Sequence, residues 1–179
     1  MNKQIFIDKL AETDSVELMI QSIFTEDDIG AVLRIHLLCE QLSEAWICAA
    51  CDANNFFGEG NYTIRMNCSD KFKLVKNLGL PEQLCSCLRI INKIRNNAAH
   101  QIGRELIPNE SIDSLIKILR EYKADNPSDD LSIDSPLETY NEDGTISGNY
   151  SILDKGTPNR IKLFICYVVL YKKIIFSIN

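Results

Sequence analysis

Residues 93–102, KIRNNAAHQI, place an arginine, two asparagines and a histidine in one short segment. A histidine exchanges protons near neutral pH, and an arginine fork holds a phosphate and stabilises negative charge that grows in a transition state. On a helix, residues four apart share a face, so Asn96 and His100 are expected on one side, with Arg95 about 140° from His100. Arg95, Asn96 and His100 are therefore candidates for a catalytic set.

The same segment is also compatible with an ordinary helix C-terminus. Cationic side chains near that end are favoured by the helix dipole by about 0.3–1 kcal/mol, and Asn96 and Asn97 would then simply be solvated. Two observations favour a functional role: the chain has only two histidines, and two adjacent asparagines inside a helix are poor helix formers.

A second candidate set precedes the first in the chain. His36 and Glu40 are four apart and Glu44 extends the row along the border of an apolar stripe. One interpretation is a border histidine beside solvated glutamates. In the other, Glu40 orients His36 or a catalytic group, provided that this helix packs against the helix of residues 93–102.

Composition limits the classes of protein to consider. With 179 residues and 45% hydrophobic content, residues 1–179 are expected to form a single helical domain. The formal charge of -6 argues against a protein that coats nucleic acid by charge alone, although a locally basic cleft stays compatible with it.

The cysteine content and the N-terminal residues predict where in the cell the protein is found. The spacing of the cysteines argues against a structural zinc site. Seven cysteines, an odd number, occur without a recognisable secretory signal, so we expect reduced thiols and a cytoplasmic protein. Cys48 and Cys51 have C-x-x-C spacing, but no second pair of ligands follows, and a structural zinc site needs four. We therefore expect neither a metal nor a cofactor.

Hydrophobic periodicity predicts an all-α bundle of about five to six helices. A membrane span is not expected, because Lys172 and Lys173 interrupt the most apolar segment, IKLFICYVVLYKKIIFSI, before it reaches about 20 residues. A polar, acidic insertion over residues 125–158 forms a long loop or a small hairpin within ETYNEDGTISGNY. The expected helices are residues 14–24, one that follows a Thr25 cap, 69–78 ending before Gly79, one from Pro81 to near Gly103, 110–123 and 159–177.

Two families resemble parts of this pattern. Arg95-Asn96-Asn97-Ala98-Ala99-His100 matches the R-x-x-x-x-H motif, with a polar residue after the arginine, of the HEPN superfamily of small helical bundles. KFKLVKNLGL followed by LRIINKIRNNAAH resembles the mannitol repressor family, which has a similar leucine-glycine-leucine corner. LRIHLLCEQLSEAW is similar to the second helix of related bundles. The resemblance covers roughly residues 26–120 and predicts a HEPN-like helical bundle.

The HEPN resemblance implies metal-independent RNA cleavage in which two protomers bring their motifs to one cleft. In that chemistry His100 would transfer the proton, Arg95 would stabilise the phosphate, and Asn96 would orient the imidazole or bond the RNA. Attack by the ribose 2′-hydroxyl leaves a 2′,3′-cyclic phosphate and needs no metal. A homodimer with an RNA substrate is the expected assembly.

Two classes of function remain open from the sequence. One is a toxin or phage-defence ribonuclease that an antitoxin or regulatory protein restrains. The other is a non-catalytic, mannitol-repressor-like regulator acting through protein contacts, which the acidic balance and the 125–158 insertion favour. Direct binding to DNA is not expected, because no helix-turn-helix with a basic recognition helix is evident.

Overall fold

The computed structural model describes residues 1–12, 15–100, 106–123, 132–141 and 143–178, with residues 99 and 100 described by their backbone alone. It confirms the predicted all-α helical bundle with a hairpin before the last helix. Its elements are α1 (Lys3–Ala11), α2 (Ser15–Phe24), α3 (Asp28–Ala50), the short 3-10 helix η1 (Gly60–Tyr62), α4 (Cys68–Asn77), α5 (Glu82–His100), α6 (Asn109–Glu121), β1 (Leu137–Tyr140), β2 (Ile146–Tyr150) and α7 (Asn159–Phe176).

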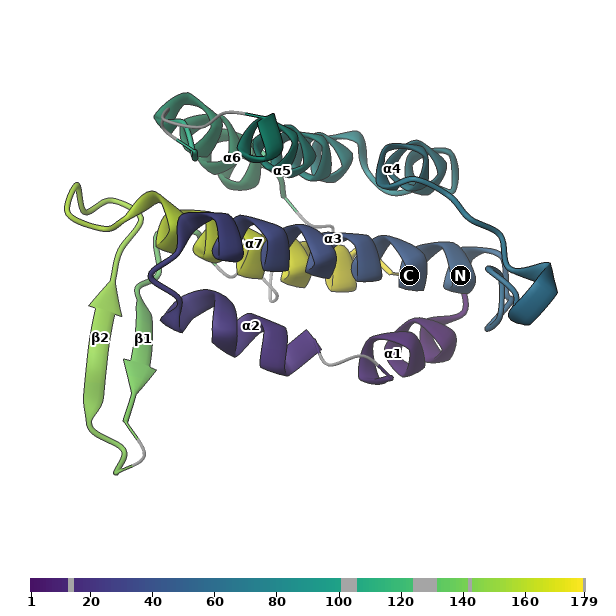
Figure 1. Ribbon diagram of the computed structural model, residues 1–179, viewed down its shortest axis with the longest axis horizontal. Coiled ribbons are helices and arrows are strands. Elements are labelled where there is room, and N and C mark those ends of the chain that lie inside the picture. The colour runs from purple at the N-terminus through teal and green to yellow at the C-terminus, as the bar shows by residue number, and fades with distance from the viewer. Residues whose placement is uncertain (13–14, 101–105, 124–131, 142, 179) are drawn as a thin grey trace.

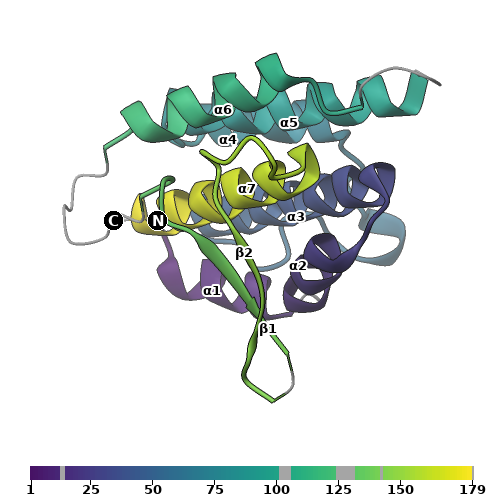
Figure 2. The ribbon, with the colours of Figure 1, turned by 90° about the vertical axis from the view of Figure 1, so that its left-hand side faces the viewer.

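The helices form three layers. The long helix α3 and helix α7 lie side by side in the middle layer (Figure 1). Helices α4, α5 and α6 cover one side of this pair, and α1 and α2 cover the other, as the turned view also shows (Figure 2). Each of the two central helices is therefore covered from both sides, which explains why their sequences are apolar around much of the helix.

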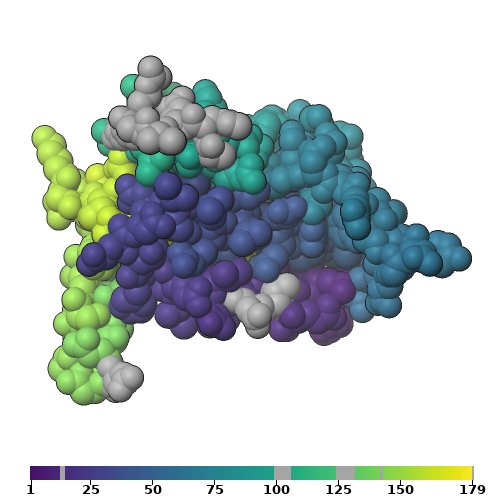
Figure 3. Space-filling view, viewed as in Figure 1, coloured from purple at the N-terminus to yellow at the C-terminus, as the bar shows by residue number. Residues whose placement is uncertain are grey.

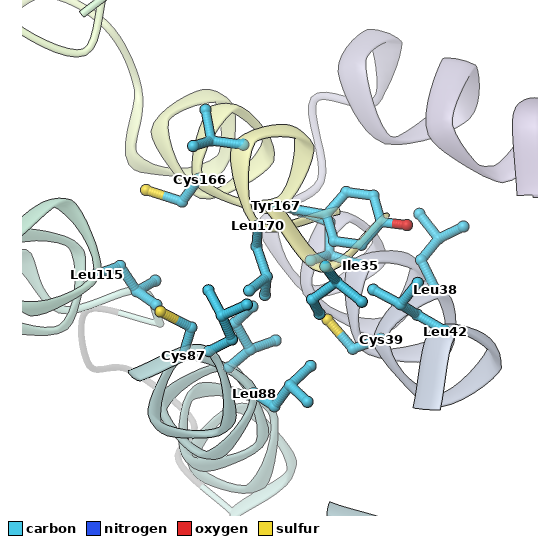
Figure 4. Packing of buried hydrophobic residues seen from close by; sticks show 14 of the residues in the cluster. Ile35, Leu38, Cys39, Leu42, Cys87, Leu88, Leu115, Cys166, Tyr167 and Leu170 are labelled. Atoms are coloured by element: carbon cyan, nitrogen blue, oxygen red, sulfur yellow. The ribbon is translucent and has the colours of Figure 1, made fainter. Parts of the chain in front are cut away.

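The core lies where α3 and α7 meet α5 and α6. Side chains from these four helices interdigitate, with Tyr167 and Leu170 of α7 close to Cys39 of α3 and Leu88 of α5 (Figure 4). Burial of each large apolar side chain contributes about 1.5–3 kcal/mol. The predicted apolar stripe of α3 is buried at Val32, Ile35, Cys39, Leu42, Trp46 and Ala49.

The start of α3 differs from the prediction. Asp27, rather than Thr25, is the capping residue, and its carboxylate accepts hydrogen bonds from the backbone N–H groups of Ile29 and Gly30. The Thr25 hydroxyl accepts from the Asp27 N–H at 3.3 Å. Asp27 stands directly before the first helical residue, so its carboxylate bonds the backbone N–H groups that have no partner within the helix. Thr25 contributes a further hydrogen bond to Asp27.

Helix α1 was not predicted. Its N-cap is Asn2, whose side chain accepts from the Ile5 N–H, and Phe6 is its one fully buried residue. The Phe6 ring meets the ring of Trp46 edge-on, with centroids 6.4 Å apart. A single buried aromatic does not produce a helical periodicity, so the packing of α1 depends on a contact that lies far away in the sequence.

The corner between α4 and α5 ends in the predicted glycine. Gly79 has a φ of +94°, the Leu80 N–H donates to the Val75 carbonyl at 3.0 Å, and the Gly79 N–H donates to the Lys76 carbonyl at 3.1 Å. These two bonds form a Schellman motif, which requires the left-handed conformation that glycine adopts without strain. The corner returns the chain so that α5 packs against both α4 and α3.

The hairpin predicted within the acidic insertion is confirmed. β1 and β2 pair antiparallel, with Leu137 opposite Tyr150 and an irregularity after Thr139. The two strands extend away from the helices (Figure 2). Residues 124–131 and 142 of this part of the chain lie outside the described residues.

Helix α7 is the buried core helix that its sequence predicted. Lys173, which interrupts its apolar run, is itself buried and donates a hydrogen bond to the Tyr122 carbonyl at 3.0 Å. Among the described residues, no helix combines the length and the apolar character needed to cross a membrane.

Candidate functional site

A cavity of about 390 Å³ lies where α3, the start of α4 and α5 meet. It brings together four of the predicted site residues, His36 and Glu40 from α3 with Arg95 and Asn96 from α5. Residues of both candidate sets therefore line one cavity. The complete lining is His36, Glu40, Asn67, Cys68, Ser69, Asn92, Arg95 and Asn96.

His36 is held at the cavity by Asn92. The side chain is only 6% exposed, and its Nε2 lies 3.0 Å from Oδ1 of Asn92 on α5. Burial lowers the pKa of His36 below its usual 6.5; the hydrogen bond with Asn92 opposes this effect, and the positive charge of Arg95 adds to it. The imidazole is therefore neutral at neutral pH, and one ring nitrogen carries a lone pair.

Arg95 has an unused donor beside this imidazole. Its Nη1 donates to Oδ1 of Asn96 at 3.1 Å, whereas its Nε is buried and has no hydrogen-bond partner among the described residues. A buried N–H group without a partner costs about 1–3 kcal/mol. The side chain of Arg95 lines the cavity, so its guanidinium can donate charge-assisted hydrogen bonds to a bound anion.

His100, the predicted proton-transfer residue, is the last residue of α5. Its side chain lies outside the described residues. The proposed geometry between Arg95 and His100 therefore stays a prediction. The helical spacing of four that links Asn92, Asn96 and His100 is a property of the sequence itself.

Glu40 is hydrogen-bonded to Lys71, and its negative charge also acts on His36, whose pKa it raises. Lys71 of α4 is 7% exposed and donates hydrogen bonds to Glu40 at 2.6 Å and to Glu44. Burial opposes protonation of Lys71, but its hydrogen bonds with Glu40 and Glu44 outweigh that effect and raise its pKa. The hydrogen bond to His36 comes from Asn92, and the expected role of Glu40, orienting His36 or a catalytic group, stays a prediction.

Cys68 is the first residue of α4 and lines the same cavity. Burial raises the pKa of its thiol to about 12, and the negative charge of Glu40 acts in the same direction. Cys68 is therefore a thiol, not a thiolate, at neutral pH. All seven cysteines are unpaired, and the predicted C-x-x-C pair consists of a buried Cys48 and an exposed Cys51.

Four lining residues were not expected from the sequence: Asn67, Cys68, Ser69 and Asn92. Lys71, which is bonded to Glu40, was not expected either. Asn92 stands four residues before Asn96, so the helical row of polar residues on α5 was a signal that could have identified it. No local pattern distinguishes Cys68 from the other cysteines, because its place depends on how the first turn of α4 packs against α3.

No family model, no curated protein and no solved structure matches the chain.

Proposed function

We propose that this protein is a metal-independent endoribonuclease of the HEPN type, acting in the cytoplasm. One observation carries the proposal: the side chain of Arg95, whose buried Nε has no partner among the described residues, lines the same cavity as the neutral imidazole of His36. An RNA phosphate provides an anion for the guanidinium, and the ribose 2′-hydroxyl provides a proton for the imidazole to accept.

The reaction breaks one bond for each bond that it forms. The 2′-oxygen attacks the phosphorus, a histidine takes the 2′-hydroxyl proton, and the bond from phosphorus to the 5′-oxygen breaks as that oxygen gains a proton. The products are a 2′,3′-cyclic phosphate and a 5′-hydroxyl. His100 is the proton-transfer residue that the motif implies, and His36 provides a second imidazole for the opposite transfer. Arg95 stabilises the charge on the phosphate oxygens.

The charges around the cavity suit an anionic substrate despite the net charge of the chain. Both carboxylates nearest to it, Glu40 and Glu44, are bonded to Lys71. Their negative charge is partly balanced by this ammonium, so Arg95 is not surrounded by unpaired acid. With Arg95 and Lys71 on one side and Glu40 and Glu44 on the other, these four charges balance, so the cavity is close to neutral although the chain is acidic.

A row of exposed apolar side chains supports a homodimer. Ile29, Leu33 and Leu37 recur every fourth residue on α3, and each is more than 40% exposed. Since Leu33 and Leu37 are each three residues from His36 or Glu40, the row borders the cavity. Helix α2, which lies beside α3 on the face drawn in Figure 3, has a second exposed apolar row, Val16, Ile20 and Phe24.

A second copy of the chain that covered these rows would remove apolar surface from water and bring two cavities toward one interface. This arrangement is the two-motif cleft that the HEPN resemblance implies. An antitoxin-like partner that competed for the same rows would prevent the cleft from forming.

The test is RNA cleavage in the presence of EDTA, comparing wild type with Arg95→Ala and His100→Ala. Arg89→Ala is the matched control, because Arg89 lies on the same helix, is exposed and is paired with Glu82. We expect cyclic phosphate ends with wild type and with Arg89→Ala, and a loss of about 10²–10³-fold with Arg95→Ala. Equal cleavage by Arg95→Ala and Arg89→Ala, with both variants folded, would overturn the assignment.

The exposed apolar rows also favour a second candidate function, a mannitol-repressor-like regulator that acts through protein contacts. In that case the cavity has no catalytic role. A folded dimer that leaves a varied panel of RNAs intact, while Leu33→Asp abolishes dimerisation, would favour this regulator over the nuclease.

A further inference from the structure

Three side chains with different metal-binding atoms converge at one end of the cavity. A ring nitrogen of His36, a carboxylate oxygen of Glu40 and the Sγ of Cys68 all lie within 4.8 Å of one another. Two come from adjacent turns of α3 and the third from the first residue of α4. We propose that His36, Glu40 and Cys68 bind a single divalent transition-metal ion of the zinc class.

The distances suit a small tetrahedral ion. Zinc binds nitrogen and oxygen at about 2.0–2.2 Å and sulfur at about 2.3 Å, which separates two ligand atoms by about 3.3–3.8 Å. The three atoms need to approach one another by no more than about 1.5 Å, which rotations of the Glu40 and Cys68 side chains provide. The mixture of nitrogen, oxygen and sulfur selects zinc or cobalt over magnesium or calcium, which prefer oxygen alone.

Asn92 prepares the imidazole for this role. When the Nε2–H of His36 donates to Oδ1 of Asn92, the lone pair of the neutral ring is on Nδ1. Metal-binding histidines usually donate their other ring N–H to a carbonyl or carboxylate, and the partner fixes the tautomer and the ring orientation. Asn92 supplies that partner from a different helix.

Lys71 permits Glu40 to bind the ion. Its ammonium contacts Oε1 of Glu40 and Oε1 of Glu44, and in the described residues no hydrogen bond engages Oε2 of Glu40. Oε2 can therefore bind the metal while Oε1 stays with Lys71. Should Glu40 rotate fully toward the ion, Glu44 remains as the partner of Lys71. In the metal-bound state, in which Cys68 is a thiolate, the positive charge of Arg95 is offset by that thiolate and by the carboxylates of Glu40 and Glu44.

Binding the ion replaces the proton of Cys68, which passes to the solvent as the metal–sulfur bond forms. Because all three ligands line the cavity, a fourth ligand position would be open to water. Three protein ligands and one open position are typical of zinc sites that bind an exchangeable ligand. The inference does not rest on the proposed ribonuclease activity. The two proposals compete for one imidazole, because a metal ion on Nδ1 of His36 would occupy the lone pair that proton transfer needs.

The test is a titration of the full chain with Co²⁺, followed by competition with Zn²⁺. A cobalt–thiolate bond produces a charge-transfer absorption that identifies sulfur as a ligand. We expect one equivalent of Co²⁺ to produce this absorption in wild type, with loss of the band in Cys68→Ser. Cys51→Ser is the matched control, because Cys51 is exposed and unpaired, and it should retain the band.

Two further variants separate ligation from general damage to the fold. Glu40→Gln keeps the side-chain shape and should weaken Co²⁺ binding at least about tenfold, and Asn92→Ala should weaken it about 10–100-fold. Far-UV circular dichroism verifies that each variant is folded. The proposal is overturned if wild type shows no cobalt–thiolate band at micromolar protein, or if the band survives in Cys68→Ser and disappears in Cys51→Ser.

Discussion

Lys71 is the residue whose replacement tests most directly how the cavity is assembled. Its ammonium joins α4 to two carboxylates of α3, and its side chain also lies over the ring of Phe57, with Nζ 5.6 Å from the ring centroid. Lys71→Met removes the charge while keeping a long, flexible stem and a good helix former. The stem still packs, so the variant isolates the two charge-assisted hydrogen bonds.

The expected loss of unfolding free energy follows from how exposed the three charged side chains are. The side chains of Lys71, Glu40 and Glu44 are 9%, 26% and 39% exposed. Removing one partner of a fully buried ion pair costs about 3–5 kcal/mol, and an exposed pair contributes about 0.2–1 kcal/mol. This half-buried group lies between those limits, so Lys71→Met should lower the free energy of unfolding by about 2 kcal/mol. Because urea m-values of small proteins are about 2 kcal/mol/M, the midpoint should fall by about 1 M.

Urea unfolding followed by circular dichroism measures this effect, and Lys73→Met is its control. Lys73 lies on the same helix, but its side chain is 71% exposed and pairs with Asp70 three residues away. The control should unfold close to the wild-type midpoint. A Lys71→Met midpoint no lower than that of Lys73→Met would refute the reasoning, because the buried ion group would then contribute no more than a surface pair.

Three further outcomes are expected. Because burial lowers the pKa of His36 below 6.5, the unfolded chain binds a proton more readily, so this residue destabilises the fold as pH falls below about 6.5. Urea midpoints of wild type and His36→Gln should therefore converge or cross between pH 7.5 and 5, and a constant difference would contradict the assignment. A thiol reagent at pH 8 should label exposed Cys51 at least about tenfold faster than Cys68, whose pKa is raised to about 12; equal rates in mass-spectrometric mapping would contradict this. Leu33→Asp should convert a dimer to a monomer in light scattering, whereas Leu153→Asp, at a loop residue 66% exposed, should not; unchanged mass in both would exclude the α3 row from the interface.

Much of the helical framework was predictable because its signals are local. The three-and-four spacing of α3, the glycine at position 79 and the turn residues of the hairpin each act within a few residues, and each was identified from the sequence. The cap of α3 was placed two residues early, since Thr25 and Asp27 are both good capping residues and only the backbone geometry selects between them.

The candidate site was only partly predictable, for a different physical reason. Arg95, Asn96, His36 and Glu40 were recognised from residue type and helical spacing. Whether α3 and α5 would place them in one cavity depended on packing between helices, which periodicity does not report. Cys68 enters the site through the same packing and carries no motif of its own.

The central position of α7 also affects how the chain folds during its synthesis. This helix completes the core against α2, α3, α5 and α6, yet it follows all of them along the chain. On a ribosome that adds about 5–20 residues per second, those helices emerge with the faces that α7 will cover still open to water. The nascent chain therefore passes through a stage in which the apolar surface that α7 later covers is available to a chaperone. This surface is covered only when α7, with Tyr167 and Leu170, has been synthesised and packs against it.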